Sequence, residues 1–257
     1  MPNTTNSPKG TLRSYLELCR ASNLPTVWTN VLAAALLCRS ANVAGSIDGT
    51  RVNSSGVVVA ALLAAIALSL LYLGGMALND VLDVEEDRVK KPGRPIPSGR
   101  ISRAGAAAFT VALFISGLLI LVAMSRPSAV GAGLLLVAVI YLYDRLHSRS
   151  WLTVLLMASC RFLVFIVTAL AVAETYNHLV ICAASVQFLY IVALTAIARW
   201  EKAAPRSFRI PPIPWMLAGI SVVDGLLMAA FVSPLWLFAG LLGAAATRLL
   251  QTQVRGD

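Results

Sequence analysis

The residues best placed to do chemistry lie in one acidic run, residues 79–87, which reads NDVLDVEED. The run follows an apolar segment long enough to cross a bilayer. Because a charged side chain at membrane depth costs at least about 2.5–3.5 kcal/mol, the run must lie at a water boundary or line a polar cavity. At helical spacing, Asn79, Asp83 and Asp87 share one face, and Asp80 lies just before Asp83. Such a row of oxygen ligands suits Mg²⁺, which binds one or two carboxylates together with substrate phosphates.

A basic loop directly follows the acidic run. Its cations are Arg88, Lys90, Lys91 and Arg94. The prolines and glycine among them exclude a continuous helix. An alternative interpretation is a solvated helix end followed by the positive loop that membrane proteins keep in the cytoplasm. In either case Glu85 and Glu86 are expected to face solvent or a neighbouring loop rather than a metal ion.

The composition excludes a soluble globular protein. Of the 257 residues, 58% are hydrophobic and only 13% are charged, and the mean hydropathy is +0.78. In a soluble protein the net charge of +9 would raise the question of nucleic acid. In a membrane protein it is a topology signal, so no nucleic-acid partner is expected. The four cysteines are dispersed, which argues against a disulfide framework or a zinc site.

Eight apolar stretches approach or reach the length of about 17–25 residues that a spanning helix needs. They cover residues 24–38, 57–79, 104–124, 128–143, 151–173, 178–198, 212–231 and 235–250. The predicted fold is therefore all-α, a polytopic membrane helical bundle. Its single transmembrane domain covers residues 24–250, between an N-terminal segment, 1–23, and a C-terminal tail, 251–257.

Positive charge is divided unequally between the two sides that eight spans define. Of the 21 Lys and Arg residues, only Arg39, Arg51 and Arg126 fall on one side, and Arg161 lies inside a span. The others fall on the side of both termini and the acidic run. The positive-inside rule therefore predicts an integral membrane protein with the acidic run and both termini in the cytoplasm.

The acidic run and the loop after it resemble the first signature of a known family. The pattern Asn79-Asp80-x-x-Asp83-x-x-x-Asp87, followed by Arg94-Pro95-x-x-Ser98-Gly99, is similar to that of the UbiA superfamily of intramembrane prenyltransferases. The resemblance implies a helical bundle, usually of nine spans, with a lateral opening to lipid and a central cavity open to the cytoplasmic side. It also implies Mg²⁺-dependent transfer of a prenyl group from a prenyl diphosphate to a lipophilic acceptor within the membrane.

Two further segments resemble the family in order and spacing. Residues 24–30, LPTVWTN, are similar to the family's first helix, which implies that Asn30 reaches the cavity. At the end of the fourth span, Tyr143 and His147 stand where the family carries Tyr-x-x-x-Lys. A shifted register would use Tyr141 and Arg145 instead.

The family's second acidic motif, normally two or three Asp, is reduced here to residues 198–201, ARWE. Together with residues 160–163, CRFL, this form resembles an EboC-like bacterial branch, which implies a protein of the bacterial inner (plasma) membrane. Arg161 in that segment lies about 15 Å into its span at 1.5 Å per residue. Two roles for it remain open: a structural pair with Asp224, at similar depth in the seventh span, or diphosphate binding.

Carried onto these positions, the resemblance implies a role for each group. The metal ligands would be Asn79, Asp80, Asp83, Asp87 and Glu201, holding Mg²⁺ against the diphosphate leaving group. Substrate contacts are expected from Asn30, Lys91, Arg94, Arg145, His147, Arg161 and Arg199. Aromatic faces would stabilise the allylic cation by about 0.5–2 kcal/mol each, and the candidates are Tyr72, Tyr143 and Phe188.

Rival functions are separated by motif and by the placement of polar residues. A UbiA-type terpene cyclase would use the same metal and diphosphate chemistry and trap the cation internally, so it remains an alternative. A CDP-alcohol phosphotransferase is disfavoured, because neither Asp48-Gly49 nor Asp224-Gly225 is followed by Ala-Arg at that enzyme's spacing. A transporter would place its polar residues near mid-membrane on broken helices rather than at one face.

Overall fold

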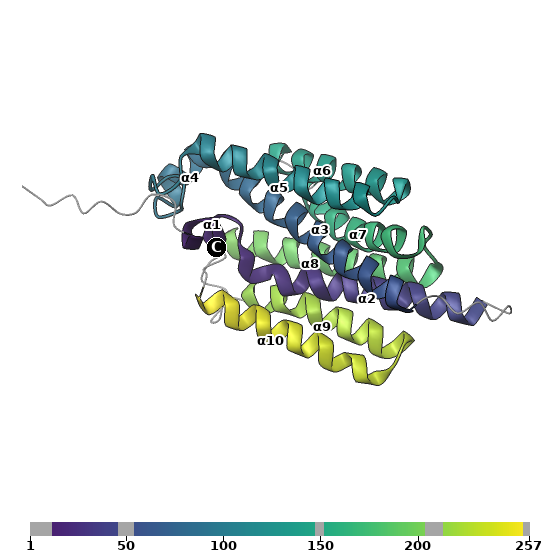
Figure 1. The fold of residues 1–257 in the computed structure, drawn as a ribbon. Helices are drawn as coiled ribbons and strands as arrows, with labels where there is room; N and C mark the ends of the chain where they lie inside the picture. Colours follow the sequence, from purple (N-terminus) through teal and green to yellow (C-terminus); the bar gives the residue numbers. More distant parts are fainter. Residues whose placement is uncertain (1–11, 46–53, 147–151, 204–212, 254–257) are drawn as a thin grey trace, which may run out of the picture.

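The computed structural model describes residues 12–45, 54–146, 152–203 and 213–253, and every regular element in these ranges is a helix (Figure 1). The elements are α1 (Leu12–Leu18), the short 3-10 helix η1 (Ala21–Asn23), α2 (Leu24–Gly45), α3 (Ser54–Leu82), α4 (Val84–Lys90), α5 (Arg103–Ala123), α6 (Pro127–Leu146), α7 (Leu152–Ala173), α8 (His178–Ala203), α9 (Ile213–Phe231), η2 (Pro234–Trp236) and α10 (Leu237–Gln253). The expectation of an all-α bundle is confirmed.

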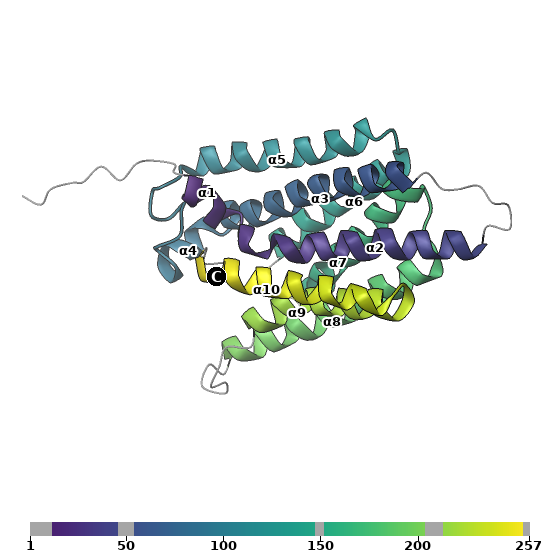
Figure 2. The same ribbon diagram turned by 60° about the horizontal axis from the view of Figure 1, so that its bottom comes forward.

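Eight helical segments of the described chain are long and apolar enough to cross a membrane, and each predicted span overlaps one of them. Figures 1 and 2 both show α1, α4 and the C-terminal end of α10 at the same end of the bundle. We name this end the mouth. There, Gln251 near the end of α10 donates a hydrogen bond to Asn23 Oδ1 at 3.0 Å. The two ends of the described chain therefore meet on one side, as an even number of spans requires.

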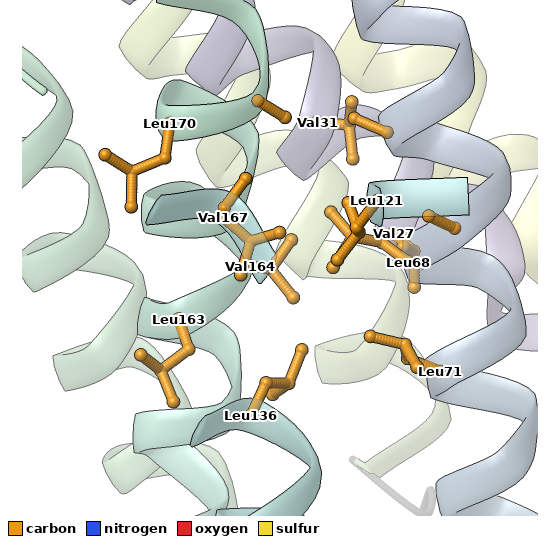
Figure 3. Close-up of a cluster of buried hydrophobic side chains, with 14 of the residues drawn as sticks. Val27, Val31, Leu68, Leu71, Leu121, Leu136, Leu163, Val164, Val167 and Leu170 are labelled. Atoms are coloured by element: carbon orange, nitrogen blue, oxygen red, sulfur yellow. The ribbon is translucent and has the colours of Figure 1, made fainter. Parts of the chain in front are cut away.

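The apolar core lies between α2, α3, α6 and α7. In Figure 3, Val27, Leu71 and Val164 point toward one another between these helices. The outer surface is apolar as well: Leu62 is 59% exposed and Leu242 is 70% exposed. A water-soluble bundle would cover such faces with charged residues, so these leucines fit contact with lipid.

Helices α9 and α10 approach each other closely through two glycines. A Cβ atom added to Gly240 would lie 2.6 Å from the Cα atom of Gly225 and 2.5 Å from the carbonyl oxygen of Ser221. Because lipid gives helices little hydrophobic reason to associate, small residues of this kind create packing surface between membrane helices. The Gly225–Gly240 contact thus fixes α9, which carries Asp224.

Candidate active site

The acidic run lies at the mouth, where α3 gives way to α4. α3 ends at Leu82, and Asp83 has φ −85° and ψ 6° before α4 begins. Helical bonding nevertheless continues through the bend: the Asp83 amide donates to the Asn79 carbonyl, and the Asp87 amide to the Asp83 carbonyl, each at 2.9 Å. The bend changes the direction of the chain but keeps Asn79, Asp83 and Asp87 one helical turn apart.

Asn79 joins two carboxylates from different helices. Its Nδ2 donates to Asp83 Oδ2 at 3.1 Å and to Oδ1 of Asp144, on α6, at 3.4 Å. Asp144 is buried, and its second oxygen, Oδ2, has no hydrogen-bond partner among the described residues. Burying an unpaired carboxylate oxygen is costly, so a bound cation, a proton or a water molecule at this oxygen would stabilise the site.

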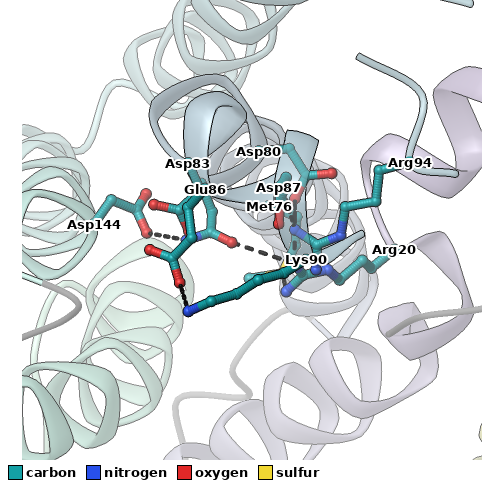
Figure 4. Close-up of polar contacts among 10 residues, drawn as sticks. Arg20, Met76, Asp80, Asp83, Glu86, Asp87, Lys90, Arg94 and Asp144 are labelled. Atoms are coloured by element: carbon teal, nitrogen blue, oxygen red, sulfur yellow. Dashed lines mark hydrogen bonds and ion pairs between the residues drawn. The ribbon is translucent and has the colours of Figure 1, made fainter. Parts of the chain in front are cut away.

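Two arginines neutralise Asp80 and Asp87. Arg20 Nη2 contacts Asn79 Oδ1 and Asp80 Oδ1, each at 3.2 Å. Arg94 Nη1 donates to Asp80 Oδ1 at 3.1 Å and to Asp87 Oδ2 at 2.5 Å. Figure 4 shows this division: Asp83 lies toward Asp144, and Asp80 and Asp87 lie toward the arginines. The single row predicted from spacing is therefore split in two, with Asn79 contacting both parts. We name the set the mouth cluster: Arg20, Asn79, Asp80, Asp83, Asp87, Arg94 and Asp144.

Short segments outside the long helices hold the arginines in place. Arg20, between α1 and η1, has a left-handed backbone conformation with φ 46°, which turns the chain toward the end of α3. Arg94 lies in the loop between α4 and α5. That loop is tied to α1 by Arg100, whose Nη1 contacts Glu17 Oε2 at 2.6 Å, and by burial of Ile96 in the same apolar cluster as Leu18.

Outside the mouth cluster, Asn30 and Arg161 contact each other deeper in the bundle. Arg161 Nη1 donates to Asn30 Oδ1 at 2.7 Å, and Asn30 Nδ2 donates to the two Asp224 oxygens at 2.9 and 2.7 Å. The expected partnership of Arg161 with Asp224 is thus indirect, because Asn30 stands between them. Asp224 also accepts from Thr29 at 2.7 Å and from Gln187 at 2.6 Å. We name the set the deep network: Thr26, Thr29, Asn30, Arg161, Gln187 and Asp224.

The residues predicted at the end of the fourth span are dispersed. Tyr143 is half-buried and adjoins Asp144 in the chain, whereas Arg145 is exposed, with its guanidinium 5.9 Å from the centre of the Tyr141 ring. His147 lies outside the described residues. These contacts test neither the Tyr143–His147 register nor the Tyr141–Arg145 register.

The reduced second motif lies near the end of α8. Arg199 donates a hydrogen bond to Thr153 of α7, and Glu201 is half-buried. Within the described chain, no hydrogen bond or ion pair joins Glu201 to the mouth cluster. Lys91 is exposed in the loop after α4, and Glu85 and Glu86 are exposed as expected. The metal role of Glu201 stays a prediction.

The donor atoms of the mouth cluster fit Mg²⁺ in type. In the described residues no three His, Cys, Asp or Glu side chains already converge as a metal site. The Asn79 amide nitrogen nevertheless brings the Asp83 and Asp144 carboxylates together, and Asp144 Oδ2 is buried with no partner among the described residues. Hard cations take such oxygens. The Asn79 oxygen, Oδ1, faces Arg20. Asp144 was not among the predicted ligands, although an acid ending an apolar span in a chain with only 12 acids was an available signal.

A lateral apolar groove of about 650 Å³ lies between α2 and α3. Its lining includes Trp28, Leu62 and Ile66, and Trp28 Nε1 donates to Ser69 Oγ at 3.0 Å at the end nearer the mouth. From Ser69 to Asn79, α3 rises about 15 Å at 1.5 Å per residue. One helix therefore connects a lipid-facing groove to the mouth cluster.

Comparison with known proteins identifies the family. The UbiA prenyltransferase family matches residues 31–252. Digeranylgeranylglyceryl phosphate synthase of Ignicoccus hospitalis is 33% identical over 190 residues, which cover 74% of this chain and 57% of that protein. The synthase of the same name from Saccharolobus solfataricus is 35% identical over 150 residues, 58% of this chain and 48% of that protein. The chain thus spans about half the length of the curated relatives it matches.

A solved structure from work on digeranylgeranylglyceryl phosphate synthase in membranes has a similar fold. It superposes with a TM-score of 0.61 at 19% identity, covering 94% of this chain and 93% of that one. Eight helices of the described chain are long and apolar enough to cross a membrane, so the bundle is that of an integral membrane protein. The family match over residues 31–252 shows that the chain belongs to the UbiA prenyltransferase family.

Proposed function

We propose that this protein transfers a prenyl group from a prenyl diphosphate to a lipophilic acceptor within the membrane. The observation that carries the proposal is the mouth cluster, in which the Asp83 and Asp144 carboxylates, joined by the Asn79 amide, lie near the guanidinium groups of Arg20 and Arg94. A site for a metal diphosphate needs oxygen ligands and cationic donors side by side. Family membership supports the same chemistry.

The residues of the mouth cluster divide the work of binding the diphosphate. Mg²⁺ held by Asn79, Asp83 and Asp144, with Asp80 and Asp87 nearby, would supply Lewis-acid neutralisation of the leaving group. Arg94 and Arg20 now neutralise acids, and a bound diphosphate offers them new anionic partners. Exchange of one anion for another leaves neither guanidinium unpaired in a partly buried position.

The prenyl chain would leave the mouth along α3 and enter the lateral groove. Its lining is almost wholly apolar, and a volume of about 650 Å³ lies within the range of sites for small molecules. Tyr143, half-buried and next to Asp144 in the chain, is our candidate for the aromatic residue that faces the allylic cation. Tyr72 is less suited, because the Arg161 guanidinium lies 5.9 Å from the centre of its ring.

The unequal distribution of basic residues supports a plasma-membrane protein with the mouth on the cytoplasmic side. In the described part of the chain, Arg13, Arg20, Arg88 and Arg94 all lie at the mouth, whereas Arg39 and Arg126 lie toward the opposite end. Accessibility of single cysteines introduced at Arg13 and Arg126 to a membrane-impermeant reagent in intact cells would test this orientation. Labelling only at position 126 is expected.

The activity is tested with detergent-purified protein, Mg²⁺ and radiolabelled geranyl, farnesyl and geranylgeranyl diphosphates. A transferase is expected to form a lipid product only when a membrane lipid extract is added, and chelation of Mg²⁺ should abolish it. A cyclised hydrocarbon or alcohol formed without extract would indicate a terpene cyclase instead. No turnover under any of these conditions would contradict both readings.

A further inference from the structure

We propose that Arg161 binds an oxyanion on the head group of the acceptor lipid, at a subsite deeper in the bundle than the diphosphate site. The proposal depends on the proposed prenyl transfer in one respect only, because that function is what makes the ligand the acceptor. A phosphate and a carboxylate share the chemistry that the subsite recognises.

Two of the five N–H donors of the Arg161 guanidinium make no hydrogen bond to the described residues. Nη1 donates to the Thr26 carbonyl at 3.3 Å and to Asn30 Oδ1 at 2.7 Å, and Nη2 donates to Thr26 Oγ1 at 2.8 Å. A guanidinium has five N–H groups, so Nε–H and one Nη2–H remain without a partner among the described residues. Nε and Nη2 form one edge of the planar group, and that edge matches two oxygens of one carboxylate or phosphate.

The rest of the deep network holds this edge in a fixed orientation. Asn30 is fully buried, and both of its hydrogen bonds to Asp224 come from Nδ2, which turns Oδ1 toward Arg161. Thr29 and Gln187 fix the Asp224 carboxylate in turn. These residues come from α2, α7, α8 and α9, so the guanidinium is braced by four helices. Such bracing is what a preorganised binding site requires.

The protein leaves two donors of the Arg161 guanidinium unused among the described residues. An apolar chain packed against the unused edge of Arg161 would leave charged donors desolvated, which is costly. A polar ligand group removes that cost, whereas the prenyl chain of the donor has the apolar groove between α2 and α3.

The subsite is separate from the mouth cluster. Arg161 lies over the ring of Tyr72, and Tyr72 precedes Asn79 by about 10 Å of helix rise on α3. In the described residues, Arg161 has no ion pair with an acid of the mouth cluster. A donor diphosphate held near Asn79 therefore leaves this edge available for a second substrate.

Binding to detergent-purified protein tests the proposal without requiring turnover. The probes are dioctanoyl phosphatidic acid, lauric acid and neutral dioctanoylglycerol, measured by native mass spectrometry and by shift of the melting temperature. Wild type is expected to bind at least one oxyanion lipid ten-fold or more tightly than dioctanoylglycerol. The first two probes decide between phosphate and carboxylate. Equal binding of all three lipids would overturn the proposal with no variant needed.

Variants locate the binding. Arg161→Gln is expected to lose the ten-fold preference, and Arg161→Lys, which keeps the charge but not the two-donor edge, should retain only a small part of it. The matched control is Arg248→Gln, because Arg248 stacks on Trp215 at 4.3 Å on the far side of α9 and should leave the preference unchanged. Retention of the preference in both Arg161 variants would overturn the proposal.

A donor analogue separates this inference from the proposed function. Geranylgeranyl thiolodiphosphate with Mg²⁺ should bind to Arg161→Gln within two-fold of wild type, and an equal loss of donor and oxyanion binding would assign Arg161 to the donor instead. Asp83→Ala should lose transfer but keep the oxyanion preference. If wild type transfers no prenyl group yet shows the Arg161-dependent preference, the proposed function fails and the oxyanion site stands.

Discussion

At the mouth of the bundle, Asp80 and Asp87 are paired with arginines from short connecting segments, whereas every polar partner in the deep network comes from a spanning helix. Arg20 and Arg94 have side chains 21% and 13% exposed, and both lie outside the long helices. Asn30, Gln187 and Asp224 are fully buried. The mouth cluster can therefore exchange partners at the cost of moving a loop, but the deep network cannot do so without moving helices.

This difference assigns the two regions different physical tasks. A site that must accept and release a multiply charged leaving group needs ion pairs that a substrate can replace. A charged side chain in the middle of a bundle needs partners that never leave, because breaking a buried pair costs about 3–5 kcal/mol. Changes at the mouth are accordingly expected to affect turnover, and changes to the fully buried members of the deep network, Asn30, Gln187 and Asp224, are expected to affect stability.

The largest effect is expected from Asp83→Ala. Asp83 contacts Asn79 at 3.1 Å and lies beside Asp144, so its loss removes a proposed metal ligand. Transfer of a labelled prenyl group should fall by roughly 10³-fold, equivalent to about 4 kcal/mol of transition-state stabilisation. The melting temperature should change little, because Asp83 lies at the bend between two helices. A variant with normal turnover would remove Asp83 from the site.

Asp224→Asn should give the opposite result. The substitution leaves Asn30, Thr29 and Gln187 without their shared carboxylate and leaves Arg161 without its compensating charge. The expected loss of stability is about 3 kcal/mol, visible as a lower melting temperature in detergent. Asp80→Asn is the comparison at the mouth, where Arg20 and Arg94 have other anionic or amide partners. An equal loss of stability in both variants would contradict the distinction between the regions.

The spans and the acidic run could be predicted from the sequence because both are local patterns. The length of an apolar stretch predicts a spanning helix, and spacing within one helix groups Asn79 with Asp83. Asp144 and Arg20 were missed as members of the mouth cluster, because each meets Asn79 only through the tertiary fold. Arg161 and Asp224 were related by depth alone, and depth does not show that the Asn30 amide lies between them.

The Gly225–Gly240 contact links the deep network to packing between helices. Gly240→Ala should destabilise the protein by about 1–3 kcal/mol, because the new Cβ would meet the backbone of α9 rather than a flexible side chain. The loss would appear as a lower melting temperature, with transfer by the folded fraction retained. Gly131→Ala is the matched control, since nothing lies within 4 Å of a Cβ added there. Destabilisation of both variants to the same extent would count against a specific close approach.

The smallest effect is expected at the exposed end of the acidic run. Glu85 has a side chain 68% exposed and contacts Arg88 at 2.9 Å, so Glu85→Gln should change stability by less than about 0.5 kcal/mol. Turnover should stay within two-fold, measured beside Asp83→Ala under the same conditions. A large loss of transfer would show that Glu85 reaches the substrate, and the mouth cluster would then extend onto α4. Unchanged turnover would confine the chemistry to the buried side of the bend. Asp87, two residues after Glu85, lies on that side and faces protein rather than water.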